Sequence, residues 1–253
     1  MSDLVLYAKD ADVAVITINN PPVNALSPGV PEGIARFVEQ AAADEEVRAI
    51  VILGGGRTFI AGADIREFGK ITSGEKPWDA NHLNGIIIGI ENCRKPVVMA
   101  IHGTALGGGL EVAMGGHYRV ASADAQVGQP EVKLGIIPGA GGTQRLPRLA
   151  GVAKAAEMCA VGEPISARAA FELGIVDRLI SGDLLVGALA FAREVAAELP
   201  PPKVRERDAK LAADHSADLA KLRSACAKRA RGQRAPLAAI EAIPADGNAS
   251  TAA

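Results

Sequence analysis

Aromatic side chains are scarce in this sequence. They make up 3% of its 253 residues, with one tryptophan, two tyrosines and five phenylalanines. Proteins that bind single-stranded nucleic acid commonly stack the bases on aromatic rings. The formal net charge of -2 also offers no general attraction to polyanions or to anionic membranes. We therefore expect neither nucleic acid nor a membrane as a partner, and a core built from aliphatic side chains and alanine.

Cysteine is infrequent as well. The three cysteines are far apart and odd in number, which indicates free thiols in a reducing compartment. Together with the four histidines they show no spacing typical of zinc ligands, so no metal is predicted. These seven residues are Cys93, Cys159, Cys226, His82, His102, His117 and His215.

The sequence also has no long apolar run. No stretch approaches the length that a membrane-spanning helix needs. The first ten residues, MSDLVLYAKD, lack the basic and then apolar pattern of a secretion signal. These features predict a cytoplasmic protein, and the length favours a single domain with a sizeable core.

Short apolar runs alternate with stretches of helical spacing. An apolar run between turn residues predicts a buried strand, and apolar residues three and four apart predict a helix. The expected strands include residues 4–7, 13–19, 49–53 and 97–101, and the expected helices include residues 31–43, 81–92, 144–149, 167–173 and 184–199. Thr143 and Ser166 are expected to cap two of these helices. The order of elements is consistent with an α/β fold.

Three consecutive prolines, residues 200–202, mark a change in composition. Residues 203–234 are rich in Lys, Arg and Ala with helical spacing, which is typical of a solvated helical face. A nucleic-acid-binding tail and a contact with ligand phosphates are the alternatives. We predict a core of residues 1–199, a C-terminal helical region of residues 200–244 and a disordered tail of residues 245–253.

Two glutamates lie in apolar or small-residue surroundings, each after a tight turn. Glu111 follows three successive glycines, and Glu131 follows Gln129-Pro130. A glycine-rich turn that leads into a helix presents free N–H groups to developing negative charge. A carboxylate in apolar company is costly unless it is paired, hydrogen-bonded or protonated, so two of them suggest an acid/base pair. The alternative is that each carboxylate only complements a helix dipole.

Other readings of the glycine-rich turns find no support. Gln144 stands where a dinucleotide-binding fingerprint needs its third glycine, and no glycine turn is followed by the lysine of a phosphate-binding loop. The sequence also lacks the G-x-S-x-G turn that would present a serine nucleophile. No cofactor is predicted.

Four blocks, taken together and in order, resemble the crotonase superfamily and specifically the enoyl-CoA hydratases. The blocks are residues 20–26 (NPPVNAL), 59–65 (FIAGADI), 106–111 (LGGGLE) and 128–146, which begins GQPE and ends GGTQRL. The resemblance spans about residues 13–180. It implies a spiral of ββα turns followed by a C-terminal helical region.

The resemblance also implies roles for individual residues. The two catalytic carboxyl groups fall at Glu111 and Glu131, and the two N–H groups of the oxyanion hole fall at Ala63 and Gly108. Gly103 lies beside the acyl pocket. Residues implied to surround the CoA moiety are Asn24, Ala25, Ala61, Ala63, Asp64 and Ile65.

The implied activity is the addition of water across the C2=C3 bond of trans-2-enoyl-CoA, which gives 3-hydroxyacyl-CoA in fatty acid β-oxidation. Acyl-CoA is then the partner, and CoA is part of the substrate rather than a separate cofactor. Superfamily relatives that lack one glutamate catalyse other reactions, so the presence of both favours hydration. The alternatives are a Δ3,Δ2-enoyl-CoA isomerase that uses Glu131 alone or shares the site, a non-catalytic acyl-CoA binder, and RNA binding through residues 203–234.

The end of the chain carries a finer resemblance. Residues 230–236 (ARGQRAP) are similar to the linker that follows the hydratase/isomerase half of multifunctional β-oxidation enzymes. Stand-alone hydratases form trimers or hexamers, and the part of the chain that carries their trimer contacts is the part that looks different here. The resemblance therefore leaves a homo-trimer, a hexamer and a monomer as alternatives.

Overall fold

The computed structural model describes residues 4–64, 66, 69, 80–212, 215–229 and 232–243. Ile65 and the predicted tail of residues 245–253 lie outside this described part of the chain. The strands are β1 (Val5–Asp10), β2 (Val13–Ile18), β3 (Ala49–Gly54), β4 (Val97–Ile101), β5 (Thr104–Leu106), β6 (Tyr118–Ser122), β7 (Gln126–Gly128), β8 (Ile165–Ser166) and β9 (Arg178–Ile180). The α-helices are α1 (Val30–Ala43), α3 (Ala80–Glu91), α4 (Gly108–Gly115), α5 (Gly142–Ala150), α6 (Val152–Val161), α7 (Ala167–Glu172), α8 (Leu184–Val195), α9 (Ser216–Arg229) and α10 (Ala235–Glu241). The described residues also include two 3-10 helices, η1 (Glu131–Leu134) and η2 (Val204–Glu206), and the predicted α/β class is confirmed.

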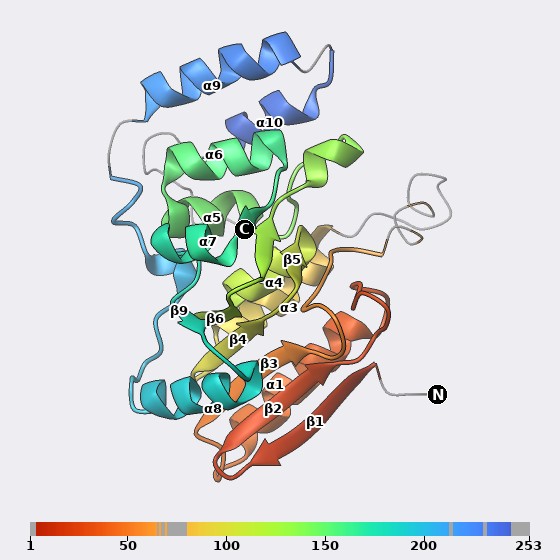
Figure 1. Cartoon of the computed structure of the whole chain (residues 1–253), viewed down its shortest axis with the longest axis vertical. Helices are drawn as coiled ribbons and strands as arrows, with labels where there is room; N and C mark the ends of the chain where they lie inside the picture. The colour runs from red at the N-terminus through yellow and green to blue at the C-terminus, as the bar shows by residue number, and fades with distance from the viewer. Residues whose placement is uncertain are drawn as a thin grey trace.

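The larger sheet has the order β1-β2-β3-β4-β6-β9 (Figure 1). Its first two strands form an antiparallel hairpin in which Val5 pairs with Ile18, and the remaining neighbours run parallel. Parallel strands need a crossover between them, which the intervening helices provide. Strand β4 is buried along its whole length, as expected for a parallel strand covered on both faces.

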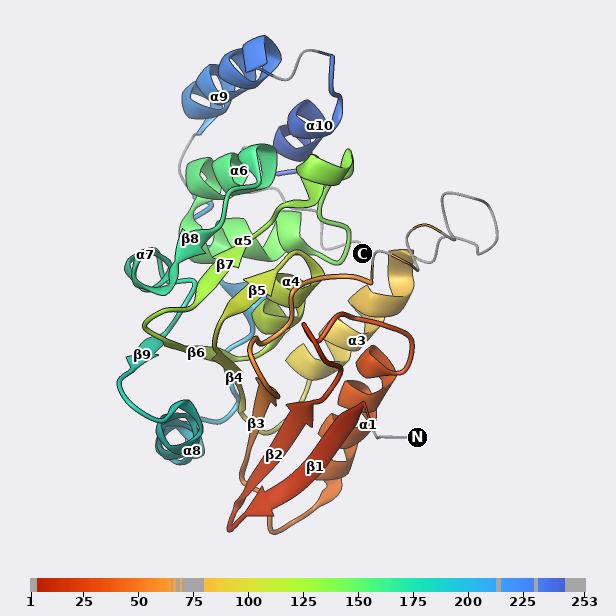
Figure 2. The same cartoon turned by 45° about the vertical axis from the view of Figure 1, so that its right-hand side comes forward.

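Alternate residues of this sheet belong to two different apolar clusters. Ala14, Ile16 and Ile18 of β2 face one cluster with buried residues of α1 and α3. Val13 and Val15 of the same strand face the other cluster, which includes the buried side of α8. Side chains alternate across a strand, so the apolar run of β2 serves both faces. Figure 2 shows α8 and α1 on opposite sides of the sheet.

The smaller sheet positions two turns side by side. Strands β5 and β7 run parallel, with Ala105 opposite Val127 and Leu106 opposite Gly128. Gly107 follows the first strand and Gln129 follows the second, and the N–H of Gly107 donates to the carbonyl of Gly128 at 2.9 Å. The carboxyl ends of neighbouring parallel strands meet at one edge of a sheet, so the residues after both strands converge.

Helices α5, α6, α9 and α10 lie at the end of the molecule beyond the smaller sheet (Figure 1). Buried residues of α9 and α10 belong to the same apolar cluster as α1 and α4, including Leu219, Cys226 and Ile240. The C-terminal region is therefore packed onto the core. The predicted boundary between residues 199 and 200 stays a prediction.

Two of the expected helix caps have different outcomes. Ser166 caps α7 as predicted, because its hydroxyl accepts the N–H of Ala169 at 3.2 Å. The prediction for Thr143 is wrong: α5 starts at Gly142, and its cap residue is Gly141 with φ of 91°. The first N–H of that helix donates to a carboxylate of another helix, as described below, and not to a hydroxyl.

Two expected helices are shorter than their sequence patterns indicate. Helix α8 ends at Val195 and not at residue 199. Within residues 203–234, only Ser216–Arg229 is α-helical among the described residues. The preceding basic residues make specific contacts instead: Lys210 donates to the carbonyls of Leu149 and Leu173.

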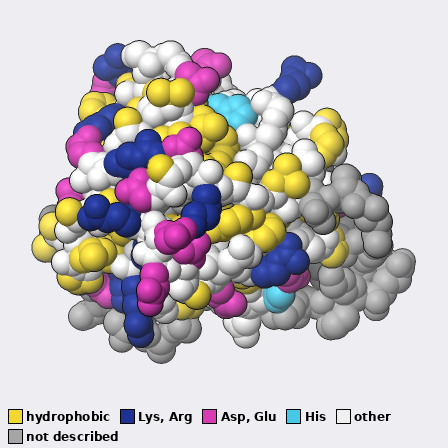
Figure 3. Space-filling view, turned by 90° about the horizontal axis from the view of Figure 1, so that it is seen from below, with side chains coloured by type: hydrophobic (Ala, Val, Ile, Leu, Met, Phe, Trp, Pro, Cys, Tyr) yellow, Lys and Arg dark blue, Asp and Glu magenta, His cyan; other side chains and the backbone are white. Residues whose placement is uncertain are grey.

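The surface at the β1–β2 end carries charges of both signs. Figure 3 shows Lys and Arg interspersed with Asp and Glu on this face. Arg193 of α8 pairs with Asp10 and Asp12, and Lys9 pairs with Glu46 at 2.6 Å. Because cations and anions alternate here, this face is mixed in charge rather than an anion-binding surface. Exposed ion pairs of this kind each contribute little to stability.

None of the helices in the described ranges combines the length and the apolar character that a membrane span requires.

Candidate active site

Helix α4 buries the first glutamate next to a tight turn. Glu111 is the fourth residue of this helix, as expected for a first-turn position, and its exposed fraction is 3%. Gly107 precedes the helix with φ of 54°, a conformation that favours glycine. A Cβ at Gly109 would lie 2.2 Å from the carbonyl oxygen of Ile60, so the helix start packs tightly against residue 60. Only glycine allows this approach.

The backbone of the turn before α5 holds the Glu111 carboxylate. Oε1 of Glu111 accepts the N–H groups of Ala140 and Gly142, each at 2.8 Å. Burial raises the pKa of Glu111, whereas the two N–H donors and the nearby Arg145 guanidinium lower it. Hydrogen bonds to the charged form of a carboxyl favour ionisation, so this environment compensates part of the cost of a buried carboxylate.

The second glutamate faces the same place from the neighbouring strand. Glu131 is the first residue of η1 and is 9% exposed. Its Oε1 lies 3.2 Å from the position that a Cβ on Gly107 would take. With its amide nitrogen toward Glu131, the fully buried Gln129 donates to both carboxyl oxygens, at 3.1 and 2.9 Å.

The two carboxyl groups influence each other electrostatically. Burial, and next the charge on Glu111, raise the pKa of Glu131 to about 8. Like charges that share a site do not ionise together at ordinary pH. The pKa of both carboxyl groups is therefore raised, and the two backbone N–H donors and Arg145 favour the ionised form at Glu111, whereas the charge on Glu111 favours the protonated form at Glu131. The two residues that the sequence pairs are brought together.

The two predicted oxyanion-hole residues lie on parallel segments. Ile60 pairs in parallel with Ala105 of β5, and Ala63 and Gly108 each lie three residues beyond that pair. Leu26 connects them, since it pairs with Ala63 and its Cδ1 lies 2.9 Å from where a Cβ on Gly108 would be. Gly108 is the first residue of α4, whose N–H has no partner within the helix. Ala63 is exposed, which leaves its backbone open to a ligand.

Asn24 stabilises the loop that precedes Ala63. Its side chain is 2% exposed, and its amide donates to the carbonyls of Gly55 and Thr58 at 2.9 and 2.8 Å. Its oxygen accepts the N–H of Asn20. The structure therefore gives this side chain a role in the loop, and its contact with CoA stays a prediction.

The other predicted CoA residues lie around the same loop. Asp64 accepts hydrogen bonds from Arg66 and from the Ser27 hydroxyl, and these lower the pKa of its carboxyl. Ala61 donates its N–H to the carbonyl of Val23 at 3.1 Å, and Ala25 is half-buried nearby. The predicted roles of these residues, and that of Ile65, stay predictions.

Gly103 has a conformational reason to be glycine. Its φ is 57°, and a Cβ there would lie 2.3 Å from the carbonyl oxygen of Arg57. The space on that side is filled by backbone, so its predicted place beside an acyl pocket also stays a prediction.

Several residues of this site were not predicted to belong to it. Gln129, Ala140 and Gly142 contact the carboxyl groups directly, and Arg145 lies behind the turn that contains Ala140. The only signal available was their place in the motif of residues 128–146. Within the described ranges, no three His, Cys, Asp or Glu side chains group as a metal site would require.

Comparison with known proteins places this geometry in a family. Residues 8–235 match the family model described as enoyl-CoA hydratase/isomerase, and the chain belongs to this family. A probable enoyl-CoA hydratase of Bacillus subtilis is 51% identical over 170 residues, which cover 67% of this chain and 66% of that protein. The peroxisomal bifunctional enzyme of Danio rerio is 43% identical over 237 residues, which cover 92% of this chain but only 32% of that protein.

The fold comparison agrees. The crystal structure of an enoyl-CoA hydratase from Bacillus anthracis superimposes with a TM-score of 0.73 at 30% identity, covering 95% of this chain and 90% of that one. The predicted crotonase fold and the resemblance on which it rested are therefore confirmed. The chain spans about two thirds of the Bacillus subtilis relative and about one third of the bifunctional one.

Proposed function

We propose that this chain adds water across the C2=C3 bond of a trans-2-enoyl-CoA and releases 3-hydroxyacyl-CoA, the hydration step of fatty acid β-oxidation. One observation carries the proposal. Two buried carboxyl groups lie on neighbouring turns: Glu111 accepts two backbone N–H groups that favour its charged form, and the pKa of Glu131 is raised to about 8 by burial and by the charge on Glu111. Hydration of an activated double bond requires one base and one acid at adjacent carbons, which is what this pair offers.

The substrate thioester carbonyl would accept the N–H groups of Ala63 and Gly108. Water addition at C3 pushes negative charge onto that oxygen, and preorganised donors stabilise the charge as it forms. Loss of one such donor typically costs about 3–4 kcal/mol of barrier.

The proton transfers then follow from the two protonation states. Ionised Glu111 takes one proton from the attacking water, whose oxygen forms the new bond to C3. Protonated Glu131 gives its proton to C2. The remaining hydrogen of the water stays on the product hydroxyl, so the atoms balance. Holding the water between both side chains removes much of its entropic cost.

The proposal is tested by incubating the chain with trans-2-enoyl-CoA esters of increasing acyl length and following the loss of the conjugated double bond. We expect saturable formation of 3-hydroxyacyl-CoA with at least one ester. Saturable binding without turnover of any ester would contradict the proposal and would favour an acyl-CoA binder.

A Δ3,Δ2-enoyl-CoA isomerase is the second candidate. The family description names both activities. Moving a proton between C2 and C4 needs one carboxyl group, and Glu131, whose pKa is raised to about 8, could both accept and return that proton. A 3-enoyl-CoA ester belongs in the same panel for this reason. Assembly as a trimer or hexamer and a cytoplasmic location remain predictions.

The pH dependence of hydration provides a further prediction. Glu131 must carry a proton to act as the acid, so kcat/KM should fall as pH rises through about 8, where this group loses its proton. Measurement of kcat/KM for crotonyl-CoA from pH 5 to pH 10 checks this. A profile that stays flat up to pH 10 would remove Glu131 from the role of acid.

A further inference from the structure

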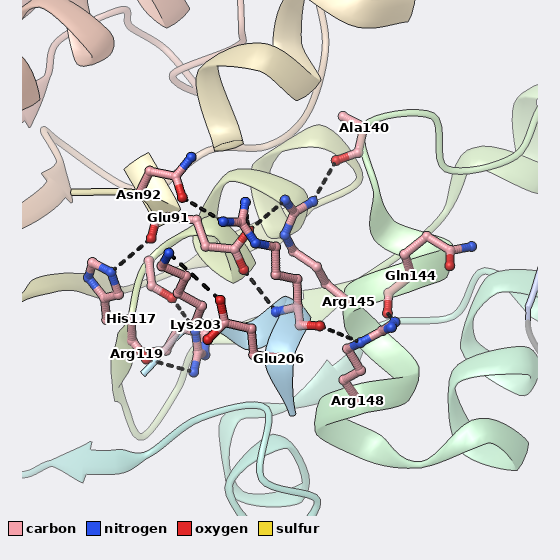
Figure 4. Close-up of polar contacts among 12 residues, drawn as sticks. Glu91, Asn92, His117, Arg119, Ala140, Gln144, Arg145, Arg148, Lys203 and Glu206 are labelled. Carbon is pink, nitrogen blue, oxygen red and sulfur yellow. Dashed lines mark hydrogen bonds and ion pairs between the residues drawn. The ribbon is translucent and has the colours of Figure 1, made fainter. Parts of the chain in front are cut away.

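A buried ion pair lies directly behind the turn that holds Glu111. Glu91, the last residue of α3, is completely buried, and its Oε2 accepts Nη2 of Arg145 at 2.9 Å (Figure 4). The other oxygen of Glu91 accepts the backbone N–H of Arg205 at 2.9 Å. The carbonyl of Glu91 accepts Nε2 of His117, whose Nδ1 accepts the N–H of Val97. The carboxylate is thus fixed in place by α3, α5 and η2 together.

The guanidinium of Arg145 packs against the turn itself. Its Nη1 donates to the carbonyl of Ala140 at 3.4 Å (Figure 4). A Cβ at Gly141 would lie 2.2 Å from the same nitrogen, and Gly141 has φ of 91°. The turn therefore has Arg145 on one side, while its N–H groups at Ala140 and Gly142 reach Glu111 on the other.

The placement of Arg145 does not maximise its own hydrogen bonds. Its Nε is buried and has no partner in the described part of the chain. A buried donor without a partner costs free energy, so the position of this side chain is set by something besides hydrogen-bond count. This position places the guanidinium in contact with the turn and holds its positive charge near Glu111.

We propose that Arg145, anchored by Glu91, is the positioning residue for Glu111: it clamps the turn of residues 140–142, and its positive charge favours the ionised form of the Glu111 carboxylate. This inference rests on the proposed function, because it assigns Arg145 to the base of the hydration reaction. Arg145 acts through the turn and through its field, and it does not touch the substrate.

Among the residues that the structure describes, the other groups around Glu111 are not cations. Glu131 faces it from η1 and is the partner acid, and Cys159 approaches from α6 with a thiol pKa raised mainly by burial. Helix α3 contributes Glu91, which is engaged by Arg145. The positive charge that favours ionisation of Glu111 therefore comes from Arg145 on α5.

The test compares pH profiles of hydration for three variants of the full chain. At low pH kcat/KM should fall as Glu111 gains a proton, and this fall is the acid limb of the profile. In Arg145→Gln the acid limb should move to higher pH by about one unit or more, because a nearby cation typically lowers a carboxyl pKa by about 1–3 units. Arg145→Lys keeps the charge but loses the planar clamp, so its acid limb should stay in place while kcat falls roughly tenfold. In the control, Arg119→Gln, the lost guanidinium is equally buried and pairs with Asp177. The acid limb of this control should not move.

Removal of one member of a buried ion pair is strongly destabilising. If Arg145→Gln does not fold, the double variant Glu91→Gln/Arg145→Gln removes both buried charges and leaves only the partly exposed guanidinium of Arg205, 3.7 Å from Glu91, without its ion-pair partner. This variant should show the same shift. If that variant also fails to fold, Arg145→Lys decides alone: wild-type kcat in this variant would overturn the clamp. An unmoved acid limb in folded Arg145→Gln or in the double variant, or an equal shift in Arg119→Gln, would overturn the proposal. An inactive wild-type chain would instead contradict the proposed function.

Discussion

Glutamine in place of Glu131 is expected to lower kcat for hydration of a trans-2-enoyl-CoA by roughly 10²–10⁴-fold, the usual contribution of a general acid or base. The amide keeps the shape of the side chain and still meets Gln129, but it has no proton to give to C2. Isomerisation of a 3-enoyl-CoA should fall with it, since both candidate reactions use this carboxyl group. Binding of CoA should survive, because the change leaves the loop around Ala63 intact.

The same substitution should raise stability at high pH. The pKa of Glu131 is about 8 in the folded chain and ordinarily 4.5. A group whose pKa is raised on folding contributes stability below its unfolded pKa, and this contribution is lost as pH rises through the folded one. Glutamine does not titrate, so the Tm of Glu131→Gln relative to wild type should increase between about pH 4.5 and pH 8 and then level off.

A matched control is available nearby, in the segment between α6 and β8. Glu163 is 69% exposed and pairs with Lys133 of η1. Glu163→Gln makes the same chemical change at the surface and should alter neither kcat nor the pH dependence of Tm. Hydration that persists in Glu131→Gln at the wild-type rate would remove this residue from the reaction.

The short-range features of the site could be predicted from the sequence. Glu111 and Glu131 are positioned by turns of a few residues, and glycine and proline specify such turns locally. The paired strands β5 and β7 then bring the turns together, because each glutamate follows its strand closely. The sequence motifs around Glu111 and Glu131 therefore predict both the two residues and the turns that position them.

The support behind the site could not be predicted in this way. Arg145 and Glu91 are 54 residues apart, and neither the periodicity of α3 nor that of α5 indicates that they meet. The same holds for Arg205, which contacts Glu91 from a segment that the sequence pattern assigned to a solvated helix. Helical spacing shows which side chains share a face, but a short segment that binds a buried carboxylate through its backbone N–H leaves no periodic signal.

Glu111→Gln should separate the two candidate reactions. The amide oxygen of glutamine can accept the N–H groups of Ala140 and Gly142 as Oε1 of Glu111 does, so the turn should keep its shape. The base for water is lost, and we expect hydration to fall by roughly 10²–10⁴-fold. Isomerisation through Glu131 alone should be retained. Both reactions should be measured on one preparation, with a trans-2-enoyl and a 3-enoyl ester of equal length. The loss of hydration is then compared directly with the isomerase activity of the same protein sample.

The charge argument gives this variant a second readout. The charge on Glu111 is the second cause of the raised pKa of Glu131, so a neutral residue at position 111 should lower that pKa. For residual hydration, which needs protonated Glu131, the fall in kcat/KM at high pH should then begin at a lower pH. For isomerisation, which begins with ionised Glu131, activity should persist to a lower pH than in the wild type. Equal loss of both reactions would mean that Glu111 serves both, and the division of labour between the two carboxyl groups would be wrong. Loss of hydration alone would show that water, and not the substrate proton, is what Glu111 activates.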